Sequence, residues 1–117
     1  MDKSQIQERT KKLLEKADRL KEFTKGLQEL LTSYVNRDAT KNYQRLIPDI
    51  GKFYGVPLPI LRLIAAEIGR FIQKEPTEAK LLLETIWNEG SFEAREIAGK
   101  SLEKFSPKNP KICLDFV

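Results

Sequence analysis

The chain has 117 residues, of which 40% are hydrophobic and 32% are charged, and it contains no histidine. This length suffices for one small domain with a core that needs no disulfides. The lack of histidine excludes the usual general base, the usual metal ligand and the Ser/His and Cys/His pairs of nucleophilic catalysis. Because the carboxylates are spread singly along the sequence, we expect no metal site and no cofactor.

The basic residues are concentrated in the first half of the chain. Residues 1–62 hold 13 Lys/Arg against 8 Asp/Glu, whereas residues 63–117 hold 8 against 9, and the net charge is +4. This asymmetry favours nucleic acid, an anionic membrane surface or an acidic protein as partner, and the alternative is a solvated, lysine-rich helix surface. No apolar run approaches the roughly 20 residues of a membrane span. The single cysteine, Cys113, predicts a reducing, cytoplasmic location.

Residues 4–35 show the spacing of a long helix, with Ser4 as its N-cap. Apolar residues and two threonines recur at alternating intervals of four and three, at Ile6, Thr10, Leu13, Ala17, Leu20, Thr24, Leu27, Leu31 and Tyr34. We call this stripe the seam. It predicts one long helix or two stacked ones, with a break or kink at Gly26. We expect a monomer in which the seam packs within the chain. The alternative is self-association of two chains through the seam, as a coiled coil.

A turn at "VNRDATKN", with Asp38 or Thr40 as cap, leads into a short helix that Pro48 ends or kinks. The following stretch, "FYGVPLPILRLIAAEIGR", holds two prolines and a glycine directly before a strong helical pattern. Proline is tolerated in the first turn of a helix, where its missing N–H has no partner. The pattern therefore predicts an extended segment entering a helix from about residue 59 to residue 73.

Two further helices are predicted after position 75. One begins at Pro76, carries Trp87 on its apolar side and ends at Gly90, and the next is capped by Ser91 and ends before "SPKNP". "KICLDFV" is a last apolar segment. No alternating strand pattern of useful length is present. The chain is thus predicted to be all-α, with antiparallel helical hairpins stacked as a solenoid, and a helical bundle is the alternative.

The segments "YGVPLPILRLIAAEI" and "WNEGSFEAREIAG" resemble the DNA alkylation repair family, the HEAT-like helical-repeat glycosylases of N-alkylated purines. The matching positions are Tyr54, Gly55, Val56, Pro59, Arg62, Trp87, Glu93, Ala94 and Arg95. Phe92 stands where relatives commonly carry a histidine. The resemblance covers residues 27–117, as the N-terminal part of a longer domain, and leaves residues 1–26 as an N-terminal helix or extension.

The resemblance implies a HEAT-like (armadillo-type) α-superhelix that binds duplex DNA and, in the complete protein, supports excision of alkylated purine bases. The family's catalytic aspartate belongs to a later W-x-x-x-D segment. These residues do not match it, since Trp87 is followed by Glu89 and by no aspartate at the required spacing. We therefore assign no catalytic residue. The alternative function is a non-enzymatic HEAT-like scaffold that binds protein or DNA.

The candidate DNA-binding residues are basic side chains that a concave helical array would present to phosphates. They are Arg62, Arg95, Arg45, Lys52, Arg70, Lys41 and Lys100. The alternative for each is a surface salt bridge, worth about 0.3–0.5 kcal/mol within a helix. Trp87 is a candidate for base stacking, but its place on the apolar side of a helix favours packing in the core. Glu93 is a candidate acid or base, but its place next to Arg95 favours a role in orienting a helix turn.

Overall fold

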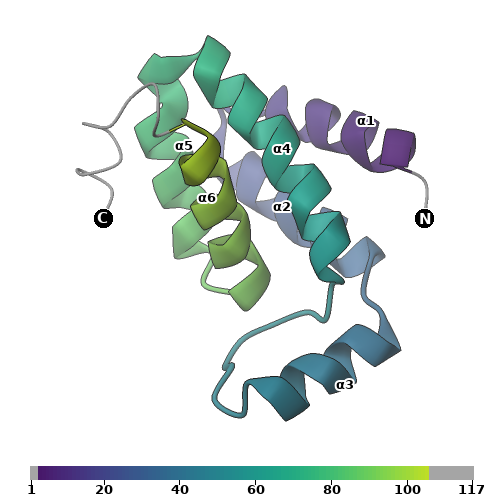
Figure 1. Cartoon of the computed structure of the whole chain (residues 1–117). Coiled ribbons are helices and arrows are strands. Elements are labelled where there is room, and N and C mark those ends of the chain that lie inside the picture. The colour runs from purple at the N-terminus through teal and green to yellow at the C-terminus, as the bar shows by residue number, and fades with distance from the viewer. Residues whose placement is uncertain (1–2, 106–117) are drawn as a thin grey trace.

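A computed structural model describes residues 3–105, and over this range the chain is built from helices connected by turns and loops, without a strand. Figure 1 shows their arrangement. The helices are α1 (Lys3–Leu14), α2 (Leu20–Ser33), α3 (Arg37–Leu46), α4 (Leu58–Lys74), α5 (Pro76–Asn88) and α6 (Phe92–Phe105). The predicted all-α class is confirmed for this part of the chain.

Of the two arrangements predicted for residues 4–35, the structure shows two helices, α1 and α2, that pack against each other. The chain turns at residues 15–19, where the backbone N–H groups of Glu15 and Lys16 donate to the carbonyls of Lys12 and Leu13. The break predicted at Gly26 is wrong, because this glycine lies inside α2. A Cβ there would lie 2.6 Å from Leu13 Cδ1, so the missing side chain lets α1 and α2 approach closely.

The seam faces the interior of the chain. Ile6, Thr10 and Leu13 of α1 and Leu27 and Leu31 of α2 are all buried. The Thr10 hydroxyl donates to the Ile6 carbonyl at 2.8 Å, which satisfies the polar group that the seam brings into the core. The 4-3 spacing thus marks the core-facing side of two helices, and a coiled-coil dimer through the seam would require the pair to unpack.

α4 is the central helix of the core. It packs against α1, α5 and α6, as Figure 1 shows, and Leu61, Ile64, Ile68 and Ile72 on it are fully buried. Pro59 lies in its first turn, as predicted, and the helix is one residue longer at each end than the expected range 59–73. One hydrophobic cluster joins residues from both sides of position 26.

The other helix ends follow from local chemistry. The caps predicted at Ser4, Asp38 and Thr40 are wrong, because α1 already includes Ser4 and because the Asn36 side chain caps α3 by accepting from the backbone N–H groups of Asp38 and Ala39. α3 ends at Leu46, before Pro48, and the starts at Pro76 and after Ser91 are confirmed. Ser91 Oγ accepts from Ala94 N at 3.1 Å.

The α3–α4 loop, residues 47–57, holds two glycines in the left-handed region, Gly51 with φ 71° and Gly55 with φ 98°. They differ in their surroundings. A Cβ on Gly55 would lie 2.0 Å from Thr40 Oγ1 and 3.3 Å from Thr40 Cα on α3, whereas a Cβ on Gly51 would meet nothing within 4 Å. Gly55 is therefore required both by its backbone angle and by the close approach of the loop to α3.

We expect Gly55→Ala to destabilise the protein clearly more than Gly51→Ala. Both substitutions place a side chain in the left-handed region, at about 1–2 kcal/mol, and only Gly55→Ala adds the clash with Thr40. Urea denaturation of both variants and the wild type would measure the difference in the free energy of unfolding. Equal losses would show that the contact between the loop and α3 gives way without cost.

Candidate nucleic-acid interface

α3 lies across one end of the molecule, next to the start of α6 (Figure 1). It is held there by Tyr43, which is buried and donates from its hydroxyl to the Val56 carbonyl. The Tyr43 ring lies 5.1 Å from the ring of Phe92 and 6.3 Å from that of Phe53, between centroids. Burial, with added repulsion from Glu93 and Glu96, raises the pKa of Tyr43 to about 12, so the hydroxyl stays protonated as a donor.

Two of the predicted DNA-binding residues, Lys41 and Arg45, lie on the side of α3 away from Tyr43. Each is two residues from Tyr43, and two residues turn a helix by roughly 200°. Both side chains are exposed. Arg45 Nη2 donates to Asn42 Oδ1 at 3.3 Å, and within the described chain neither cation forms an ion pair. The docking of α3 by Tyr43 therefore aims these two cations at solvent.

The loop that supports α3 is anchored on Glu93, which is fully buried in the first turn of α6. Glu93 Oε2 accepts from the backbone N–H groups of Gly55 at 2.7 Å and Val56 at 3.0 Å, and Oε1 accepts from that of Tyr54 at 3.0 Å. A carboxylate near a helix N-terminus is also stabilised by the helix dipole. Of the two roles left open for Glu93, the geometry supports the structural one.

Glu89 is the second buried anchor, at the end of α5. Its Oε2 accepts from Tyr54 Oη at 2.6 Å and from Lys52 Nζ at 3.0 Å, and its Oε1 accepts from Ser91 N at 3.0 Å. Gln28 of α2 adds a bond of 3.3 Å. Burial alone would raise the pKa of Glu89, but the hydrogen bonds from Ser91, Tyr54 and Lys52 outweigh it and lower the pKa to about 2.

Lys52, a predicted phosphate contact, is thus the counter-ion of Glu89. Its ammonium also donates to the Glu89 carbonyl at 3.0 Å, although the Lys52 side chain is 53% exposed. Sequence reasoning missed this pairing. A signal was present, because a glutamate at a helix C-terminus is disfavoured by the helix dipole and requires compensation from another segment.

The four remaining candidates differ in their partners. Arg62 is exposed on α4 and makes no ion pair with any residue that the structure describes. Arg70 pairs with Glu67, and Lys100 lies 3.7 Å from Glu96, so these two match the salt-bridge alternative. The guanidinium of Arg95 stacks on the ring of Trp87.

Trp87 does not lie in the core. It is 41% exposed, and the guanidinium of Arg95 lies 4.9 Å from its ring centroid. This distance is within the range of a cation–π contact. The expectation that Trp87 is a core residue is therefore wrong, because the buried side of α5 consists of Ala79, Leu82, Leu83 and Ile86.

Four of the seven predicted cations belong to elements at the end of the molecule where α3 lies, α5 ends and α6 begins (Figure 1). Lys41 and Arg45 lie on α3, Lys52 in the α3–α4 loop pairs with Glu89, and Arg95 of α6 stacks on Trp87 of α5. Arg62 follows in the second turn of α4. Arg70 and Lys100 lie further along their helices, Arg70 about 12 Å beyond Arg62 by helix rise. We call Lys41, Arg45, Lys52 and Arg95 the basic end.

The family described as DNA alkylation repair enzyme matches residues 27–117. The chain belongs to this family. The match begins inside α2 and covers α3 to α6, including the α3–α4 loop and both carboxylate anchors. No curated protein and no solved structure matches the chain.

The described part of the chain shows neither a metal cluster nor a membrane-spanning helix. Within residues 3–105, no three Cys, Asp or Glu side chains gather in a way that could hold a metal ion. None of the helices there is both long enough and apolar enough to cross a bilayer. Cys113 and the apolar segment "KICLDFV" lie outside the described residues.

The protein should lose stability as the pH falls from about 5 towards 2, because Glu89 has a lower pKa folded than unfolded. Its ionised form is stabilised by the fold, so this contribution is present above the ordinary pKa of 4.5 and disappears on the way to 2. The shift corresponds to about 3 kcal/mol. Denaturation in urea across this pH range would measure it.

Glu89→Gln should remove that part of the pH dependence and lower stability at neutral pH. Glu84→Gln is the matched control, since it makes the same change on α5, the helix that Glu89 caps, without removing a partner of Lys52, Tyr54 or Ser91. An unchanged pH profile in Glu89→Gln would contradict the assignment.

Proposed function

We propose that this chain binds duplex DNA through the phosphate backbone and, in the complete protein, supports excision of alkylated purine bases. The observation that carries the proposal is the pair Lys41 and Arg45 on α3, exposed and without carboxylate partners among residues 3–105, inside the segment that matches the DNA alkylation repair family. We further propose that the helices stack as a HEAT-like array and that the protein acts in the cytoplasm.

The physical case for phosphate binding rests on how the cations are held. An exposed cation that has no partner can release a counter-ion from DNA without first breaking an ion pair. α3 is fixed by Tyr43 and by the anchored loop, so Lys41 and Arg45 are positioned before DNA arrives. Arg62, one turn into α4, extends the same kind of surface. Such contacts set register on the duplex and carry no base specificity.

The proposed chemistry requires little of this part of the chain. N-alkylated purines are cationic and leave readily, so a carboxylate that stabilises the developing charge on the sugar suffices. Glu89 and Glu93 are buried and engaged with the α3–α4 loop. We therefore assign residues 3–105 to DNA binding and support, not to the bond-breaking step.

A non-enzymatic scaffold is the second candidate function. It is favoured by the engagement of both buried carboxylates of the α5–α6 turn, which accept hydrogen bonds that hold the fold together. The two functions make different predictions for the complete protein. Incubation with duplex DNA that carries an alkylated purine should release the free base if the first is right and leave the DNA intact if the second is.

Binding of a fluorescent duplex should weaken steeply with salt, and Lys41→Gln/Arg45→Gln should flatten that dependence. Each lost phosphate contact lowers the slope of log affinity against log salt by about 0.9, so the double variant should lose about 2. Fluorescence anisotropy across a salt series measures both slopes.

Lys21→Gln/Lys80→Gln is the control for net charge. It removes two exposed cations from α2 and α5 and should keep the wild-type slope. Absence of duplex binding at low salt would overturn the proposal, and an equal loss of slope in both double variants would show that binding is not localised to α3.

A further inference from the structure

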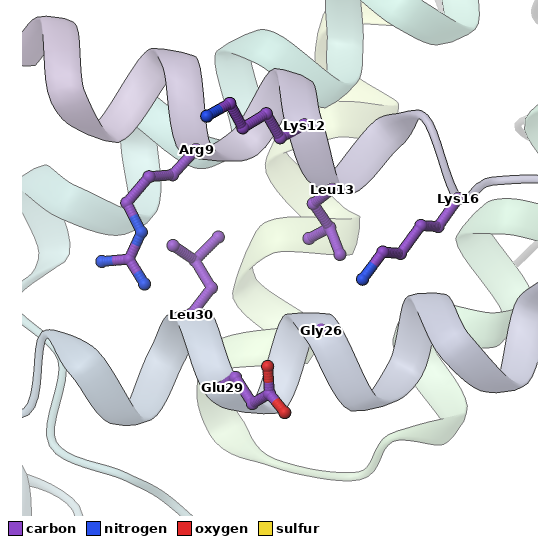
Figure 2. Close-up of a pocket in the computed structure, with 7 residues that line it drawn as sticks. All are labelled: Arg9, Lys12, Leu13, Lys16, Gly26, Glu29 and Leu30. Atoms are coloured by element: carbon purple, nitrogen blue, oxygen red, sulfur yellow. The ribbon is translucent and has the colours of Figure 1, made fainter.

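A small groove lies between α1 and α2, outside the basic end. Its volume is about 200 Å³, and Leu13, Gly26 and Leu30 form its apolar part. Figure 2 shows the side chain of Arg9 on α1 and that of Lys16 in the turn after α1 reaching towards α2 on either side of these leucines, while Lys12 extends along α1. We call this the α1–α2 groove.

The groove carries a surplus of positive charge. Arg9, Lys12 and Lys16 line it together with a single carboxylate, Glu29. None of the three cations forms an ion pair with any side chain in the described part of the protein. Like charges gathered around one hollow repel each other, and an anion bound there would relieve that repulsion.

Arg9 is held in place before any ligand binds. Its Nη2 donates to Ser33 Oγ at 2.9 Å, and its guanidinium lies 5.1 Å from the centroid of the Tyr34 ring. A guanidinium has five N–H donors in a planar fork, so one bond to Ser33 leaves donors for a second acceptor. This fork matches the paired oxygens of a phosphate.

Gly26 explains why the groove exists. A glycine inside a helix costs about 1 kcal/mol relative to alanine, so its place in the middle of α2 calls for a packing reason. That reason is Leu13, which a Cβ at position 26 would approach to 2.6 Å. The close approach brings the cations of α1 opposite the side of α2 that carries Glu29 and Leu30.

We infer that the α1–α2 groove binds one backbone phosphate of duplex DNA. The volume supports a single small anion, because it lies below the roughly 300–1,000 Å³ of small-molecule pockets. The inference rests on the proposed function and extends it. It assigns α1, which precedes the family-matched residues 27–117, to the DNA contact.

The test is duplex binding by Lys12→Gln/Lys16→Gln, measured by anisotropy across a salt series. Glutamine keeps high helix propensity, and both lysines are exposed, so the fold is expected to persist and thermal unfolding would verify it. Loss of one phosphate contact should reduce the salt slope by about 0.9. Lys21→Gln/Lys80→Gln, with the same change of charge, should keep the wild-type slope.

The outcomes separate this inference from the proposed function. If the wild type binds and Lys41→Gln/Arg45→Gln flattens the slope while Lys12→Gln/Lys16→Gln does not, only the role of the groove is overturned. If the wild type does not bind duplex, both are overturned. If Lys12→Gln/Lys16→Gln loses affinity for a polyglutamate peptide but not for the duplex, the groove is a protein-docking site and the inference is overturned.

Discussion

The arrangement of this domain depends on two buried carboxylates at one helix turn. Glu89 is the C-cap of α5 and Glu93 lies in the first turn of α6. Between them they accept hydrogen bonds from the backbone of residues 54–56, from Tyr54 Oη and from Lys52. A buried carboxylate without partners would be strongly disfavoured, and these two are stable because an irregular loop saturates their oxygens. The α3–α4 loop and the α5–α6 turn therefore satisfy each other's hydrogen-bonding groups, and neither would keep its geometry alone.

That mutual dependence determines where α3 lies and what it can do. α3 contributes only Tyr43 to the buried residues, so its position is set by the loop and by the Phe53 and Phe92 rings. A helix held by one face in this way exposes the opposite face, which carries Lys41 and Arg45. The polar network inside the domain thus holds these cations in place and takes Lys52 for its own charge balance.

The α1–α2 pair adds a second basic surface, which arises from close helix packing and not from a buried polar network. There the determining feature is the close approach of α1 and α2 at Gly26, which sets Arg9 and Lys16 around an apolar floor. The α1–α2 pair and the α5–α6 pair share one hydrophobic core through α4. The core thus connects two cation-bearing surfaces of the domain.

Periodicity and turn chemistry in the sequence determined the all-α class, the proline-marked starts of α4 and α5, and the Ser91 cap, because each depends on neighbours within four residues. The family motifs were also readable from sequence, since their glycine and prolines act locally. Tertiary structure decided the rest. Whether the seam paired within the chain, whether Trp87 was buried, and whether Lys52 faced DNA or Glu89 depended on residues tens of positions apart. Coulombic and hydrogen-bonding partners of that kind are set only when the loop closes onto α6, and no local pattern encodes them.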